Sequence, residues 1–231
     1  MTVLAFDTSM AACSAAILHD GAASPIQCFE RMERGHAEAL FPMIEVVMAE
    51  AGCGFGDLTK LAVTIGPGSF TGVRAGVAAA RGFALAAKLP VVTATSLEIM
   101  AHSAVKGTIA SERANGFMVA HDARRGEFYI QRFGTEGEPL SVPELCSLAE
   151  AACSLPESMQ LLVGSGAAAI ALEAERRGRE LRAILPGLLP EALYLADIAS
   201  VKTAEFCPVA PLYLRAPDAK PQTDKNLARA G

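Results

Sequence analysis

The sequence contains no tryptophan, and aromatic residues make up only 6% of its 231 positions, although hydrophobic residues together make up 52%. Alanine alone supplies roughly a fifth of the chain, well above its average usage in globular proteins. Charged residues, at 19%, are too few for a disordered chain of high charge and low hydrophobicity. Because alanine buries little apolar area, we expect the fold to depend on close approach of backbones rather than on large core side chains.

The sequence also lacks an apolar segment long enough to cross a bilayer, since the longest, residues 75–92, is interrupted by Arg81, Lys88 and Pro90. Its formal net charge of −5 is the opposite of what a stand-alone nucleic-acid-binding protein shows. The N-terminal MTVLAFDTS has neither the basic region nor the cleavage site of a signal peptide. We therefore expect a cytoplasmic protein that does not contact a membrane.

Patterns typical of metal sites and catalytic centres are missing as well. No Cys-x-x-Cys pair, closely spaced histidine pair or Gly-x-Ser-x-Gly segment occurs. We therefore predict no metal site and no catalytic residue, and we expect reduced, mostly buried thiols. The six cysteines are Cys13, Cys28, Cys53, Cys146, Cys153 and Cys207.

Hydrophobic periodicity predicts the same order of elements in both halves, strand-strand-strand-helix-strand-helix. In the first half we expect these elements at residues 2–7, 13–19, 26–32, 36–51, 61–65 and 73–88. A strand at 91–94 and a helix at 96–105 follow, with Ser96 as its N-cap. In the second half we expect strands at 117–121, 127–133, 139–142 and 161–164, and helices at 143–153, 166–177 and 191–203.

This repetition indicates a duplicated α/β unit, with a mixed sheet in each lobe. Each half opens on a strand that ends in an aspartate, Asp7 in the first and Asp122 in the second. We expect an N-terminal lobe at residues 1–104, a C-terminal lobe at 105–215 and a loose tail at 216–231.

A glycine-rich loop, GPGSFTG, joins a predicted strand to a predicted helix at residues 66–72. Backbone N–H groups at Gly66, Gly68 and Ser69 could bind an anion at the start of the helix. The loop is not a Walker motif, because no Gly-Lys-Ser/Thr follows, and its glycines could instead permit a tight, closely packed turn.

The other candidate ligands are equally open to two interpretations. Asp7 and Asp122 could coordinate Mg²⁺ through water, or could form a hydrogen bond to the backbone at the turn that ends their strand. Gly164 and Gly166 could approach a nucleotide, or could simply turn a strand into a helix.

Two consecutive helices, at 36–51 and 73–88, are apolar over more than one stripe. In the second, the only charges are Arg74, Arg81 and Lys88, which are seven residues apart and share one narrow face. Either these helices are central to their own lobe, or they bind a protein partner. The predicted interface residues are Leu40, Met43, Val47, Arg74, Val77, Ala78 and Arg81.

The segments AFDTS, GPGSFTGVR, HDARRGEFY and PLYLR occur in this order, and together they resemble the TsaB (YeaZ) family over essentially the whole chain. The resemblance implies two lobes of the actin/Hsp70/sugar-kinase (ribonuclease H-like) ATPase class. It implies a scaffold subunit that pairs with a TsaD-like catalytic subunit and is joined by a TsaE-like ATPase. That complex transfers threonylcarbamoyl to N6 of the adenosine beside the anticodon, in tRNAs reading codons that begin with A. The resemblance further implies that tRNA is met only through the complex, and that the chain alone is a homodimer through its two apolar helices.

The resemblance also bears on metals and cofactors. Where the catalytic relative carries an HLEGH metal motif, this chain has Ser96 and Met100 at the two ligand positions, which bind iron or zinc poorly. The superfamily places glycine after its strand-end aspartates, whereas Thr8 and Ala123 stand there in this chain. We therefore expect no required cofactor, and ATP or ADP only weakly or at a subunit junction. The residues of this degenerate nucleotide site would be Asp7, Thr8, Gly66, Gly68, Ser69, Asp122, Gly164 and Gly166.

Two alternatives stay open from the residues alone. One is a small ATPase or a metallopeptidase-like enzyme of the same fold, in keeping with the older glycoprotease label of the family. The other is a homodimeric interaction module unrelated to tRNA. Calorimetry with ATP and Mg²⁺ would separate the enzyme from the scaffold.

Overall fold

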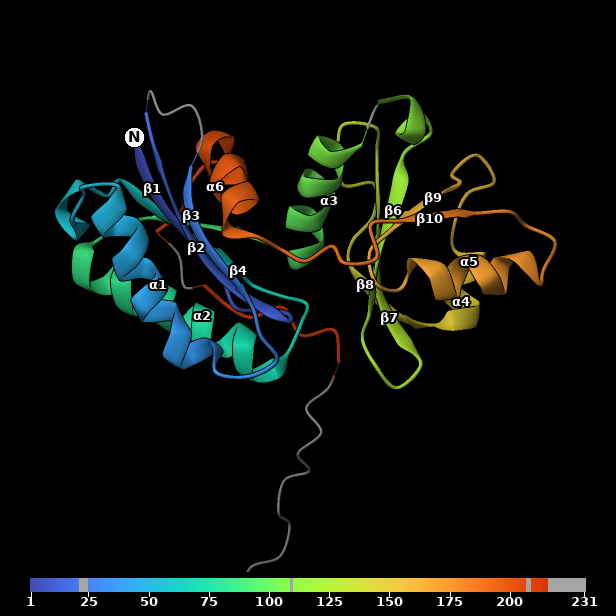
Figure 1. The fold of residues 1–231 in the computed structure, drawn as a ribbon, viewed down its shortest axis with the longest axis horizontal. Coiled ribbons are helices and arrows are strands. Elements are labelled where there is room, and N and C mark those ends of the chain that lie inside the picture. The colour runs from blue at the N-terminus through green and yellow to red at the C-terminus, as the bar shows by residue number, and fades with distance from the viewer. Residues whose placement is uncertain (21–24, 109, 207–208, 216–231) are drawn as a thin grey trace, which may run out of the picture.

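The computed structural model describes residues 1–20, 25–108, 110–206 and 209–215, so Cys207 and the tail expected at 216–231 lie outside the described residues. The first lobe is built on a five-stranded sheet of order β3-β2-β1-β4-β5. Its strands are β1 (Thr2–Asp7), β2 (Ala12–His19), β3 (Ile26–Arg31), β4 (Lys60–Thr64) and β5 (Val91–Ala94). Helices α1 (His36–Glu50) and α2 (Phe70–Ala87) cover one face of this sheet (Figure 1).

The second lobe repeats this arrangement, with a sheet of order β10-β9-β6-β7-β8. Its strands are β6 (Phe117–Asp122), β7 (Glu127–Phe133), β8 (Glu144–Ser147), β9 (Leu161–Val163) and β10 (Arg182–Ile184). Helices α4 (Leu148–Cys153) and α5 (Ala167–Glu175) lie on its outer face. Short 3₁₀ turns occur at Phe55–Asp57 and Ala110–Arg113. The predicted duplicated, two-lobed α/β fold is confirmed.

The remaining two helices cross between the lobes. Helix α3 (Ser96–Gly107) follows the last strand of the first sheet but packs against β6 and β7 of the second, whereas α6 (Ala192–Val201) packs against β1 and β2 of the first (Figure 1). The two helices also contact each other, with His102 Nε2 3.6 Å from Asp197 Oδ2. Helix α3, expected in the first lobe, therefore also covers the apolar inner face of the second sheet, and α6, expected in the second lobe, covers that of the first.

Small side chains allow α6 to lie close on the first sheet. Its buried face presents Ala192, Ala196 and Ala199, which pack on Ala5 and other small residues of the strands. This contact accounts for part of the high alanine content, because a helix can approach a sheet closely only where both surfaces carry short side chains.

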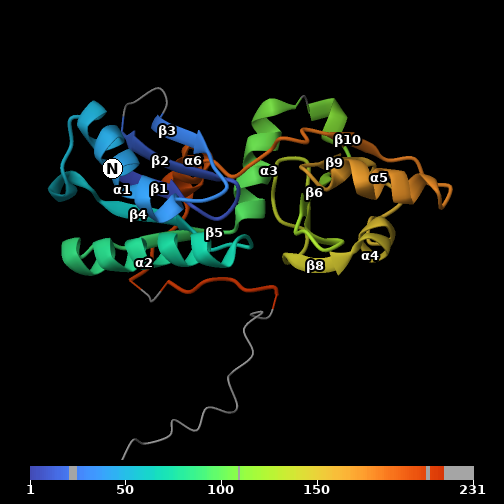
Figure 2. The ribbon, with the colours of Figure 1, turned by 60° about the horizontal axis from the view of Figure 1, so that its bottom comes forward.

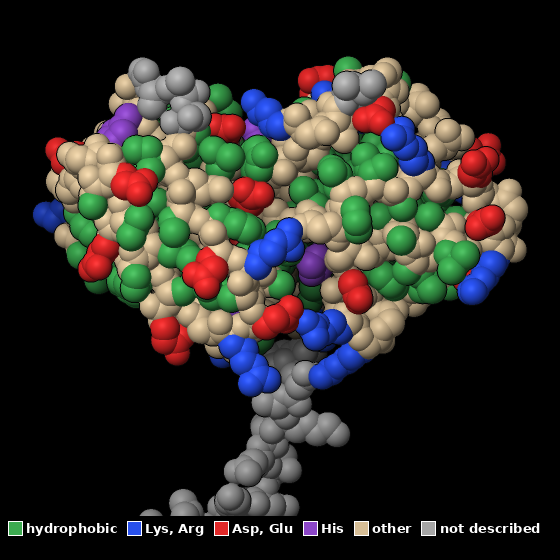
Figure 3. Space-filling view, viewed as in Figure 1, with side chains coloured by type: hydrophobic (Ala, Val, Ile, Leu, Met, Phe, Trp, Pro, Cys, Tyr) green, Lys and Arg blue, Asp and Glu red, His purple; other side chains and the backbone are tan. Residues whose placement is uncertain are grey.

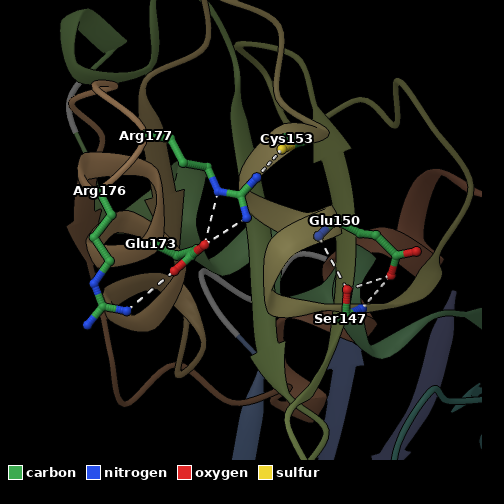
Figure 4. A network of polar contacts seen from close by, with 6 residues as sticks. All are labelled: Ser147, Glu150, Cys153, Glu173, Arg176 and Arg177. Atoms are coloured by element: carbon green, nitrogen blue, oxygen red, sulfur yellow. Dashed lines mark hydrogen bonds and ion pairs between the residues drawn. The ribbon is translucent and has the colours of Figure 1, made fainter.

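The second lobe departs from prediction in one region. The expected strand at 139–142 and helix at 143–153 are wrong: β8 occupies Glu144–Ser147, and the helix begins only at Leu148. Ser147 caps this helix, because its side chain accepts a hydrogen bond from the Glu150 N–H while Glu150 reaches back to the Ser147 N–H (Figure 4). Strand β10 was not predicted. The cap of α3 is Thr95 rather than Ser96.

Helices α4 and α5 are joined on the surface by Arg177. Its guanidinium lies 2.8 Å from Glu173 Oε1 on α5 and donates to the Cys153 sulfur at 3.2 Å (Figure 4). Such exposed pairs contribute little to stability. All five described cysteines are free: Cys13 is buried, Cys153 is exposed and the other three are half-buried. None of the described helices is long and apolar enough to span a bilayer.

Candidate functional site

A cavity of about 590 Å³ lies between the lobes. The first lobe supplies the turn after β1, the glycine-rich loop and the start of α2, and the second lobe supplies the turn between β6 and β7. Residues 212–215 form a third wall. Of the predicted nucleotide-site residues, only Gly68, Ser69 and Asp122 line this cavity.

The glycine-rich loop packs closely against the backbone that follows β1. A Cβ atom added at Gly68 would lie 2.0 Å from the Ser9 carbonyl oxygen, and one added at Gly72 would lie 2.0 Å from that of Thr8. The Ser69 N–H donates to the Ser9 carbonyl at 2.7 Å. The backbone after β1 therefore occupies the approach to the loop, and the geometry favours the tight-turn interpretation of these glycines over a phosphate seat.

Asp7 is fully buried and does not line the cavity. Its Oδ1 accepts hydrogen bonds from the Ser9 hydroxyl at 2.7 Å and the Ser9 N–H at 3.3 Å, while Oδ2 has no hydrogen-bond partner among the described residues. Burial raises the pKa of this carboxyl to about 6, although the hydrogen bonds from Ser9 oppose the shift. Asp7 thus stabilises the turn that follows it. Thr8 packs beneath α2, where its hydroxyl donates a hydrogen bond to the Gly72 carbonyl at 2.7 Å.

Asp122 makes the equivalent turn in the second lobe, but at the surface. Its Oδ1 accepts the Arg124 N–H at 2.7 Å. The neighbouring His121 is partly enclosed, and this burial lowers the pKa of its imidazole to about 4, so the ring is neutral at pH 7.

Gly164 and Gly166 repeat the packing seen in the first lobe. A Cβ atom at Gly164 would lie 2.4 Å from the Ala120 carbonyl oxygen, and one at Gly166 would lie 2.7 Å from the Phe128 ring. The Gly166 N–H donates to the Ala120 carbonyl at 3.0 Å. Both glycine loops therefore press against the end of the central strand of their own sheet.

The positions where the catalytic relative has metal ligands are built into the protein interior. The Ser96 hydroxyl donates to the Pro67 carbonyl at 2.6 Å, and the Ser96 N–H donates to the Gly66 carbonyl at 2.9 Å. Met100 is fully buried in the core of the second lobe. Over the described part of the chain, no three His, Cys, Asp or Glu side chains are grouped to hold a metal.

Residues 209–215, which we call the strap, run beside α2 and then reach the second lobe (Figure 2). The Leu212 N–H donates to the Ile65 carbonyl at 2.7 Å, and Arg74 donates to the Tyr213 hydroxyl at 2.7 Å. At the far end, Arg215 pairs with Glu127. No sequence pattern predicts this wall of the cavity, since a short extended segment carries no periodic signal.

Four of the predicted interface residues are not available to a partner. Leu40, Met43, Val47 and Val77 are buried in the core of the first lobe, because they face the sheet. For these four the interface prediction is wrong. Arg74, Ala78 and Arg81 are exposed.

A different set of apolar side chains points outward from the two helices. Phe41 is 52% exposed, Val46 is 46% exposed and Leu85 is 83% exposed. We call the exposed surface of the two helices, which carries these three side chains and Ala78, the α1–α2 face. The charges beside it are segregated: the exposed charged residues of α1 are Glu38, Glu45 and Glu50, and those of α2 and its C-cap are Arg74, Arg81 and Lys88.

Family models, curated sequences and solved structures all match this chain to proteins named TsaD, TsaB or YeaZ. The family model described as tRNA N6-adenosine threonylcarbamoyltransferase, TsaD, matches residues 30–199. The tRNA threonylcarbamoyladenosine biosynthesis protein TsaB of Haemophilus influenzae is 34% identical, over 93% of this chain and 94% of its own length. The protein of the same name from Escherichia coli is 36% identical over 63% of this chain. A crystal structure from Pseudomonas aeruginosa, of a protein described as similar to peptidase YeaZ, superposes with a TM-score of 0.78, at 28% identity, over 93% of this chain and 99% of that one.

Proposed function

Because the chain belongs to the TsaB (YeaZ) family, we propose that it is a non-catalytic scaffold subunit in the transfer of threonylcarbamoyl to tRNA. The target is N6 of the adenosine beside the anticodon, in tRNAs reading codons that begin with A. Its partners are a TsaD-like catalytic subunit and a TsaE-like ATPase, and it meets tRNA only through the complex. The protein acts in the cytoplasm.

The α1–α2 face is the observation that carries this proposal. It presents exposed apolar side chains, Leu85 above all, on two neighbouring helices, of which α1 carries acidic and α2 basic exposed residues. A surface divided in this way fits a second helix pair of the same design, turned so that each acidic helix meets a basic one. A TsaD-like subunit with a related helix pair would match it. In isolation two copies would pair about a two-fold axis, which gives a homodimer with the same patch on both sides.

The packing around the glycine-rich loop supports a role without chemistry of its own. Thr8 and Ser9 fill the space beside the glycine-rich loop, and Ser96 is engaged with the Pro67 carbonyl rather than with a ligand. The chain then requires no cofactor, and ATP or ADP binds only weakly or at a junction with another subunit.

Reconstitution tests the proposal. The purified chain is mixed with TsaD-like and TsaE-like subunits, the adenylate-forming enzyme, ATP, threonine, bicarbonate and tRNA, and modified adenosine is measured. We expect modification to fall to background when this chain is omitted, and to return when it is added back. Unchanged modification without the chain would rule out the scaffold role. Tight Mg²⁺-dependent ATP binding by the chain alone would favour an enzyme of the same fold.

A further inference from the structure

The turn between β6 and β7 holds two arginines in a backbone conformation that disfavours them. Arg124 has a φ of 64° and Arg125 a φ of 61°, and Gly126 follows at 75°. Left-handed positions suit glycine or asparagine, and other residues are strained there. Asparagine or glycine would stabilise this turn better than arginine does. The two guanidinium groups therefore have a use that the turn itself does not explain.

Both arginines line the interlobe cavity, and Arg215 of the strap joins them from another segment. The carboxylates in the same wall are Glu33 and Asp122, and Glu127 beside the wall is paired with Arg215, so basic and acidic side chains meet at the mouth of the cavity in a chain whose net charge is −5. The start of α2 lies on the same cavity and adds the positive end of a helix dipole. Basic side chains, interleaved with acidic ones, lie where the two lobes meet (Figure 3).

Arg124 is occupied by a carboxylate from the other lobe. Its Nη2 atom lies 2.9 Å from Glu33 Oε2, and the two side chains are 78% and 70% exposed. Both residues also line a second pocket of about 350 Å³, so the ion pair lies between that pocket and the interlobe cavity. An ion pair this exposed contributes at most about 1 kcal/mol, and another anion can replace Glu33 at little cost.

We propose that the mouth of the interlobe cavity binds a phosphate group, with Arg124 as the principal ligand beside Arg125 and Arg215, and with Glu33 as an internal competitor. Guanidinium groups form paired hydrogen bonds to phosphate, and a cluster of three suits a group with more than one negative charge. The site is distinct from the glycine-rich loop, whose approach Thr8 and Ser9 close. It does not depend on the proposed scaffold role. The phosphate belongs either to a small molecule or to an RNA strand, and in the second case the chain would contact RNA directly and not only through the complex.

The test measures binding of two probes, inorganic pyrophosphate and tRNA, to the full chain at low salt. Glu33→Gln removes the competitor and should tighten binding about two- to fivefold, the range that corresponds to an exposed ion pair. Glu30→Gln is the matched control, because it removes the same charge from an exposed position near the end of β3 that does not line the cavity, and it should change binding less than Glu33→Gln does.

Arg124→Asn removes the guanidinium while suiting the left-handed backbone, so it should weaken binding at least about fivefold without lowering the melting temperature. In the double variant, Glu33→Gln should no longer tighten binding, because Glu33 acts through Arg124.

Saturable binding of pyrophosphate assigns the site to a small phosphate compound, and binding of tRNA alone assigns it to an RNA strand. The proposal is overturned if neither probe binds, if Arg124→Asn binds as wild type does, or if Glu33→Gln and Glu30→Gln behave alike.

Discussion

Gly72 lies so close to Thr8 that a Cβ atom added to it would come within 2.0 Å of the Thr8 carbonyl oxygen. The contact joins the first turn of α2 to the backbone that follows β1. Its partner is backbone rather than a flexible side chain, so neither element can move aside without disturbing the sheet. The same helix carries Gly82, whose Cβ position is open.

These two glycines allow a matched comparison within one helix. Gly72→Ala should destabilise the protein by about 2–4 kcal/mol, because it forces α2 away from the sheet. Gly82→Ala should stabilise it by about 0.5–1 kcal/mol, because alanine restricts the unfolded chain and favours the helix. Urea denaturation of both variants measures this. Equal effects of the two substitutions would contradict the packing described for Gly72.

The buried carboxyl of Asp7 should make stability depend on pH. Its pKa is about 6 in the folded protein against an ordinary value of 3.8, so the protonated form favours folding. That contribution is complete below about pH 3.8 and is lost as pH rises through 6. Asp7→Asn is neutral at every pH. Its free energy of unfolding should therefore rise relative to that of wild type by up to about 3 kcal/mol between pH 4 and pH 7.

Denaturation curves of wild type and Asp7→Asn across that range provide the measurement. Asp122→Asn alters the equivalent turn at the surface and serves as the control. If the stability difference between Asp7→Asn and wild type stays constant from pH 4 to pH 7, Asp7 does not titrate as described.

The α1–α2 face should govern association. Leu85→Glu places a carboxylate where the acidic helix of a second copy would approach, and should raise the dissociation constant of the proposed dimer at least about tenfold. Leu172→Glu makes the same change on α5, where the leucine is also exposed, and should leave the dimer intact. Light scattering over a concentration series distinguishes them. A dimer that survives Leu85→Glu unchanged would place the interface elsewhere.

The strap should become more mobile when the hydrogen bond between Arg74 and Tyr213 is removed. Tyr213→Phe removes the hydroxyl that accepts from Arg74 and leaves the ring, so the expected loss of stability is only about 0.5–1.5 kcal/mol. A sharper measure is hydrogen exchange of the Leu212 amide, which the Ile65 carbonyl protects and which should exchange severalfold faster. Tyr194→Phe on α6 should leave that amide unchanged. If both variants exchange alike, Arg74 does not hold the strap.

Sequence patterns located nearly all of the elements because most of them are long and periodic. Strand β10 escaped because it is not an apolar run: Arg182 and Ala183 are exposed, whereas the equally short β9 is buried throughout and was predicted. The predicted helix start at residue 143 is wrong, although Ser147 and Glu150 have the spacing of a capping box that marks the true start of α4.

The interface residues show a limit of another kind. Val77 and Leu85 are both apolar residues of α2, yet one faces the sheet and the other faces outward. A helix that is apolar on several sides does not reveal from its sequence which stripe is core. The position of the strap and the exchange of α3 and α6 are likewise long-range contacts with no local pattern.

The exchange of helices has a consequence for how the protein is made. The inner face of the first sheet, including Val3 and Ala5, is covered by α6, which ends at Val201. A ribosome adds about 5–20 residues per second, so this face waits on the order of 5–20 s after β5 has been synthesised before its cover exists. Throughout that interval the inner face of the nascent first sheet is an apolar surface exposed to solvent. The lobe can therefore complete its folding only when nearly the whole chain has been translated, and any mRNA that ends early should yield a protein that aggregates.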